Sequence, residues 1–180
     1  MQNIIYKSDS ILPWDTQSAF KMTSYNTTCE ENMVFCYLKG YVNAGNLVLC
    51  SYCFTESPTG NDNIHLYLNL NPENPDKVLK IDFGYDGISC AHICGNSTDC
   101  ISYHPFRADD EQGFYWCGEI TIPAENIQQL YGVKLEEKEL IAMNMVQTFE
   151  NGDFSVLCGD ATQTDYNPVK NMEIFVILNY

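Results

Sequence analysis

Short runs of alternating apolar and polar residues dominate this chain. Residues 64–70 alternate strictly, so Ile64, Leu66, Leu68 and Leu70 share one face, as in a strand with one buried side. Helical spacing is confined to residues 124–131, where Ile127 and Leu130 are three apart. The pattern predicts strands over residues 33–41, 47–54, 64–70, 78–83, 114–122, 140–149, 154–157 and 173–178.

Turn residues separate these runs. Asn43–Asn46 predicts a hairpin turn, Pro72 and Pro75 interrupt the chain after residue 70, and Asp86-Gly87 suits a turn with positive φ. Residues 88–112 show no clear period and predict a long loop or an irregular excursion. We therefore expect residues 1–180 to form a single all-β domain, a two-sheet antiparallel β-sandwich of jelly-roll or immunoglobulin-like type with one short helix.

Charge narrows the range of partners. The 180 residues include 9 basic and 24 acidic side chains, a net charge of −15. This balance opposes binding to nucleic acid or to an anionic membrane, both of which require Lys and Arg. No apolar run reaches the length of a membrane helix, and the first fourteen residues carry no signal-peptide pattern. We expect a cytoplasmic protein whose acidity serves mainly solubility.

Nine cysteines indicate reduced, buried thiols, because their number is odd and several lie in apolar runs. Five potential zinc ligands fall close together, at Cys90, His92, Cys94, Cys100 and His104. Structural zinc sites usually show two pairs of ligands two to four residues apart, which this spacing lacks. Zinc is therefore not expected, and small buried hydrophobic side chains are the favoured interpretation.

Catalytic patterns are weak. The chain has three histidines and no serine in a glycine-flanked elbow. A glycosidase needs two carboxyl groups facing each other across a cleft, and no pair stands out from the sequence. We expect a protein that is not an enzyme.

Aromatic side chains are more informative, with 12 Tyr, 9 Phe and 2 Trp. Sugars present apolar faces that stack on such rings, while polar side chains take their hydroxyl groups. Trp14 precedes any regular strand, where it suits a ligand platform or a lid over the core equally well. Trp116 lies within a predicted strand, and a buried position is the favoured interpretation.

The order of segments resembles the carbohydrate-binding-module family-nine-like domains of bacteria. The resemblance extends from about Trp14 to Leu178. The matching segments are Leu66-Tyr67-Leu68-Asn69-Leu70-Asn71-Pro72 after Asp62, Lys80–Gly87, Tyr115–Pro123, Ala142–Met145 and Asn167–Phe175.

This resemblance implies a non-catalytic domain that binds a sugar or oligosaccharide. The sugar would stack on Trp14, Trp116 or Tyr166, with Asn144 and Asp62 as polar partners. Calcium is also possible, since some members of the family bind it at the edge of the sandwich.

The chain departs from the family at the two tryptophans that would clamp a terminal sugar. Met145 and Gln147 stand near one position, and Tyr52 and Phe54 near the other. Two alternatives therefore stay open. One is a structural or protein-interaction sandwich that has lost the sugar site. The other is a metal-dependent hydrolytic or accessory domain that uses the ligands between Cys90 and His104.

Overall fold

Hydrogen bonds join the strands into one continuous sheet that curls back on itself. The computed structural model describes residues 3–22, 24–26, 36–54, 63–87, 89–110 and 113–180. The elements in chain order are β1 (Asn3–Ser8), η1 (Trp14–Thr16), β2 (Phe20–Lys21), β3 (Ser24–Tyr25), β4 (Cys36–Asn43), β5 (Asn46–Phe54), β6 (Asn63–Asn69), β7 (Leu79–Gly84), β8 (Ser89–Ile93), β9 (Asn96–Thr98), β10 (Ser102–Asp110), β11 (Gly113–Ile122), α1 (Ala124–Tyr131), β12 (Leu140–Thr148), β13 (Phe154–Val156) and β14 (Glu173–Asn179).

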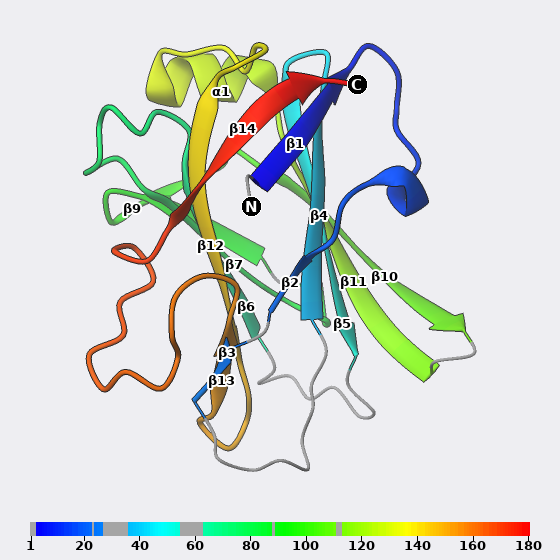
Figure 1. The fold of residues 1–180 in the computed structure, drawn as a ribbon, viewed down its shortest axis with the longest axis vertical. Coiled ribbons are helices and arrows are strands. Elements are labelled where there is room, and N and C mark those ends of the chain that lie inside the picture. The colour runs from blue at the N-terminus through cyan, green and yellow to red at the C-terminus, as the bar shows by residue number, and fades with distance from the viewer. Residues whose placement is uncertain (1–2, 23, 27–35, 55–62, 88, 111–112) are drawn as a thin grey trace.

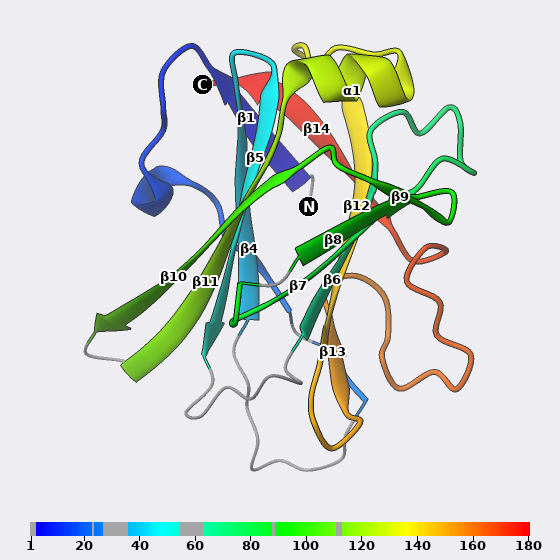
Figure 2. The ribbon, with the colours of Figure 1, turned by 180° about the vertical axis from the view of Figure 1, so that it is seen from behind.

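The sheet folds into two facing walls (Figures 1 and 2). The first wall contains β10-β11-β5-β4, and the second contains β12-β6-β7-β8-β9. Between them, β1 pairs in parallel with both β4 and β14, and β14 continues into β12. The prediction of an all-β sandwich is confirmed. The antiparallel two-sheet arrangement is confirmed only in part: the described pairs within each wall are antiparallel, whereas β1 joins the two walls through parallel pairs.

The core lies between the walls and follows the alternation of the strands. In β7, Leu79, Ile81 and Phe83 are buried, while Lys80 and Asp82 are partly exposed. The same rule operates in the first wall, where β5 sends Leu47, Leu49 and Cys53 inward. Each wall therefore presents a second, outward row of side chains whose identity the core does not dictate.

A glycine permits the closest approach of the two walls. A Cβ atom at Gly118 of β11 would lie 2.9 Å from Phe83 of β7 and 2.8 Å from the ring of Tyr103 in β10. The Tyr103 hydroxyl donates a hydrogen bond to the Gly84 carbonyl oxygen at 2.7 Å, which ties β10 to the second wall. Gly118 is therefore a packing position of the core.

Residues 88–112 differ from the expected loop. Their described part forms β8, β9 and the long strand β10, which pairs with β11 from Ser102 to Asp110. Cys94 and Gly95 make the tight β8–β9 turn, with φ values of 50° and 81°. Polar residues here occupy outward positions and a sheet edge, and they mask the period of the strands.

The predicted helix is confirmed as α1, which covers one end of the sandwich. It buries Ile127 and Tyr131, and Gly132 ends it in the left-handed region at φ 73°. The Tyr131 hydroxyl donates to the Leu68 carbonyl oxygen at 3.2 Å. No helix in the described ranges is long and apolar enough to cross a membrane.

Two neighbouring substitutions test this packing. Gly118→Ala adds a Cβ against two aromatic rings and should lower the free energy of unfolding by about 1–3 kcal/mol. Ser51 of β5, which pairs with Gly118, is buried, and its hydroxyl has no hydrogen-bond partner among the residues that the structure describes. Ser51→Ala should therefore leave stability unchanged or raise it. Urea denaturation of both variants measures the difference, and equal losses would contradict the proposed packing.

Candidate functional site

The outward side of the first wall carries a row of aromatic rings. Cross-strand register aligns Tyr37, Tyr52, Cys117 and Phe106 on four neighbouring strands. Tyr37 stacks on Tyr52 with ring centroids 4.8 Å apart, and Phe106 meets Tyr52 edge-on at 6.3 Å. Tyr37 and Phe106 are partly exposed, whereas Tyr52 is nearly buried between them. The row spans roughly 14 Å across the wall at the usual strand spacing.

A polar row runs beside the aromatic row on the same side of the wall, displaced by two residues along each strand. It aligns Lys39, Cys50, Glu119 and His104. The Lys39 ammonium lies 5.7 Å from the ring centroids of both Tyr37 and Tyr52. The row therefore places an ammonium, a carboxylate and an imidazole next to the aromatic rings.

Trp14 belongs to the short helix η1, the small blue coil in Figure 1, and contacts the polar row. Its indole N–H donates to the Glu119 carboxylate at 3.2 Å, and Lys39 donates to its carbonyl oxygen at 2.6 Å. The indole also packs edge-on against Tyr41, with centroids 5.2 Å apart. Three contacts therefore hold a partly exposed tryptophan over the wall. We call this surface the aromatic face, and it comprises Trp14, Tyr37, Lys39, Cys50, Tyr52, His104, Phe106, Cys117 and Glu119.

The two cysteines of the aromatic face are neutral at ordinary pH. Burial raises the pKa of the Cys117 thiol to about 12, and with help from Cys117 it raises that of Cys50 further. A nucleophilic cysteine needs a lowered pKa. Both thiols therefore act as small apolar contacts between the larger side chains.

Two of the predicted site residues are structural. Trp116 is 1% exposed and faces the core, so the prediction that a sugar stacks on it is wrong, because no ligand reaches its ring. Asn144 is 0% exposed on the outward side of the second wall, beneath the segment that follows β13. Asp62 lies outside the described residues.

Both the oxygen and the nitrogen of the Asn144 side-chain amide bind that segment through hydrogen bonds. Its oxygen accepts from the backbone N–H groups of Met145 at 2.8 Å and Cys158 at 3.0 Å. Its nitrogen donates to the Tyr166 hydroxyl at 2.7 Å and to the Pro168 carbonyl oxygen at 3.0 Å. The Asn144 amide is therefore fully used inside the protein, and the expected hydrogen bond from it to a sugar has no donor or acceptor available.

The hydroxyl group of Tyr166 is already engaged in hydrogen bonds within the protein. Its hydroxyl donates to the Cys158 carbonyl oxygen at 2.8 Å, and its ring packs on Phe154 with centroids 5.9 Å apart. The structure thus brings Tyr166 and Asn144 together, but places Trp14 on the opposite wall. Lys39, Tyr52 and Glu119, which share a surface with Trp14, were missed because their alignment depends on strand register.

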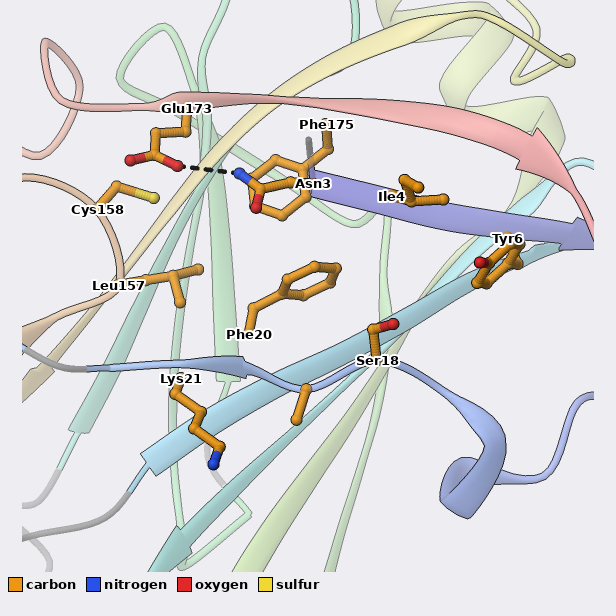
Figure 3. Close-up of a pocket in the computed structure, with 11 residues that line it drawn as sticks. Asn3, Ile4, Tyr6, Ser18, Phe20, Lys21, Leu157, Cys158, Glu173 and Phe175 are labelled. Carbon is orange, nitrogen blue, oxygen red and sulfur yellow. Dashed lines mark hydrogen bonds between the residues drawn. The ribbon is translucent and has the colours of Figure 1, made fainter. Parts of the chain in front are cut away.

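Figure 3 shows a separate cavity of about 310 Å³ in the seam where β2 and the bridging strands β1 and β14 leave a gap. The Asn3 amide donates to Glu173 at 2.9 Å on one side, and Phe20 lies edge-on to Phe175 at 4.9 Å on the other. The phenyl rings of Phe20 and Phe175 thus contact each other, and the Glu173 carboxylate already accepts a hydrogen bond from Asn3. This side pocket shares no residue with the aromatic face.

Comparison of sequences with family models and with curated proteins gives no match, whereas comparison of folds gives clear ones. A family 9 carbohydrate-binding module from Caldicellulosiruptor kristjanssonii, in complex with cellotriose, superposes with a TM-score of 0.73 at 8% identity, covering 100% of this chain and 95% of that one. A family 9 module from the same organism in complex with glucose gives 0.72 at 9% identity, covering 99% and 97%.

A third structure, from Bacteroides uniformis and described as a candidate carbohydrate-binding protein, gives a TM-score of 0.74 at 8% identity and covers 98% of this chain and 99% of that one. The chain has the fold of the family 9 carbohydrate-binding modules. The resemblance seen in the order of segments is therefore confirmed for the fold, although fewer than one residue in ten is identical.

Asn144→Ala tests the structural role of this residue. Removing the amide leaves buried backbone groups without partners, so the free energy of unfolding should fall by at least about 2 kcal/mol. Asn151→Ala, at an exposed turn position, is the matched control and should cost less than about 1 kcal/mol. Chemical denaturation measures both, and a loss no greater than that of the control would show that the Asn144 network contributes little.

Proposed function

We propose that this chain is a non-catalytic carbohydrate-binding domain and that its sugar lies on the aromatic face. One observation carries the proposal: an aromatic row and a polar row run side by side on an outward surface, with Trp14 held over them. Trp14, Tyr37 and Phe106 are partly exposed on this surface, and apolar side chains bordered by charged groups are typical of an interaction site.

The aromatic row suits the apolar face of a pyranose ring. Tyr37 on β4 and Phe106 on β10 present partly exposed rings, so successive sugar units of an oligosaccharide can contact different rings, while the buried Tyr52 supports both of them from β5. Trp14 gives the largest ring of the face and projects over it from η1. Stacking of this kind contributes through burial of apolar surface and needs no movement of the sheet.

The polar row supplies the complementary hydrogen bonds. The Lys39 ammonium donates, the Glu119 carboxylate accepts, and the His104 imidazole does one or the other at each nitrogen. Glu119 already accepts a hydrogen bond from Trp14, which fixes one oxygen and leaves further lone pairs for a hydroxyl group. Charge-assisted bonds of this type set the orientation of a sugar and its specificity.

The chemistry of the face favours binding over hydrolysis. Glu119 is the only carboxylate among the residues that define it, and glycoside hydrolysis generally requires two opposed carboxyl groups. The fold comparison also supports a sugar ligand, since two of the similar structures hold cellotriose and glucose. Oligosaccharides of β-linked glucose are therefore the first ligands to test.

Calorimetric titration with cellotriose and glucose tests the proposal. The wild-type protein should bind cellotriose more tightly than glucose, because a longer ligand covers more of the aromatic row. Trp14→Ala should weaken binding at least tenfold, about 1.4 kcal/mol, and Glu119→Gln should weaken it to a smaller extent.

Tyr180→Ala is the control, because this tyrosine is 68% exposed and is not one of the residues of the aromatic face. It should bind as the wild type does. No binding to these sugars or to a wider glycan panel would reject the function and favour the protein-interaction alternative. Binding that is unchanged in Trp14→Ala and in Tyr52→Ala would instead place the sugar site elsewhere on the molecule.

A further inference from the structure

Three metal-ligating side chains meet on the outward side of the second wall. Asp82 of β7 and Cys90 and His92 of β8 bring a carboxylate oxygen, a sulfur and a ring nitrogen within 4.8 Å of one another. This cluster lies on the wall opposite the aromatic face and shares no residue with it. Asp82 and His92 are partly exposed and Cys90 is exposed, so an ion can reach them.

Strand geometry brings the three groups together. Cys90 and His92 are two residues apart on one strand, so their side chains share a face. Asp82 stands directly opposite Cys90 in the antiparallel pair of β7 and β8. Because the spacing comes from the register of two paired strands, it is available without rearrangement of the backbone.

The cluster differs from the one that the sequence suggested. Cys100 is buried in the core, and His104 belongs to the aromatic face on the first wall. Cys94 lies in the β8–β9 turn and is exposed. The structure keeps Cys90 and His92 as a pair and adds Asp82 from the preceding strand β7.

A neighbouring histidine holds the carboxylate in position. His65 of β6 contacts Asp82 through Nδ1 at 2.5 Å, while its Nε2 lies 3.3 Å from the Thr148 hydroxyl. Histidine and hydroxyl groups that orient the ligands are a regular part of metal sites. Asp82 is thus oriented from β6 while its carboxylate faces β8.

The Lys80 ammonium would compete with a metal ion for the Asp82 carboxylate. Its ammonium lies 2.8 Å from one Asp82 carboxylate oxygen and 3.0 Å from the other. Lys80 is partly exposed on a flexible stem, and its ring contact with Tyr67 at 6.0 Å offers it another place on the surface. A bound cation would displace the Lys80 ammonium from the carboxylate.

We propose that Asp82, Cys90 and His92 form a binding site for a divalent transition metal ion of the zinc class. Sulfur and nitrogen ligands favour zinc or cobalt over calcium, which prefers oxygen alone. Ligand atoms in a tetrahedral zinc site lie roughly 3.5 Å apart, given bonds of about 2.0–2.3 Å, so small side-chain rotations close the cluster. Asp82 and His92 also line a hollow of about 580 Å³, together with Tyr67 and Lys80.

Cobalt(II) titration of the reduced, full-length protein tests the site. Cobalt takes the same ligands as zinc, and its bond to a thiolate gives an intense near-ultraviolet absorption. We expect one equivalent of cobalt to produce this band together with the visible bands of tetrahedral cobalt, and zinc to abolish both by displacement. Cys90→Ser should remove the thiolate band, and His92→Ala should weaken binding at least tenfold.

Two further variants distinguish this site from general thiol binding. Cys94→Ser removes the neighbouring exposed cysteine and should leave the spectrum unchanged. Lys80→Gln should tighten cobalt binding several-fold, because it removes the competing ammonium. Circular dichroism confirms that each variant is folded. The proposal is rejected if the wild type gives no thiolate band, if folded Cys90→Ser retains it, or if Cys94→Ser loses it.

Discussion

Phe83 lies against the bare backbone of Gly118, and this contact defines how closely the two walls of the curled sheet approach each other. Core packing requires small and large side chains to alternate across facing positions. The strands meet this requirement with every second residue, from Leu47 and Leu49 in β5 to Ile81 and Phe83 in β7. The remaining half of each strand is therefore under much weaker constraint, and both proposed sites lie in that half.

The aromatic face and the proposed metal cluster arise in the same way, because strand register aligns outward side chains on neighbouring strands. On the first wall, register places rings beside charged groups over four strands. On the second wall, it places Asp82 opposite Cys90 and Lys80 opposite His92. Because the strands are fixed by their inward residues, these outward groups are preorganised, and their substitution should alter binding more than folding. Asn144 is the exception, since a covering segment makes its outward position part of the interior.

Much of the fold could be predicted from alternation and turn residues, including the strand at 64–70 and the helix at 124–131. The strands within 88–112 could not, because Asn, Ser, Thr and Asp there suit an exposed edge as well as a loop. Site residues were harder to predict. For Trp14 the sequence left a ligand platform and a core lid equally open, and the structure places it over the wall; for Trp116 it favoured the buried position that the structure shows. The partnership of Glu119 with Trp14 joins segments far apart in the chain, and that of Asp82 with Cys90 depends on the register of β7 with β8, a strand that the sequence did not predict.

The placement of the two tryptophans gives the protein separate optical signals. Trp14 is partly exposed, carries a hydrogen bond from its indole to a carboxylate and lies on the aromatic face. Trp116 is enclosed by the core, and among the described residues its indole N–H has no partner. A ligand on the aromatic face can therefore change the emission of Trp14 while that of Trp116 stays constant, whereas loss of the fold exposes both rings. A variant that keeps only one of the two tryptophans assigns each signal, without an added label.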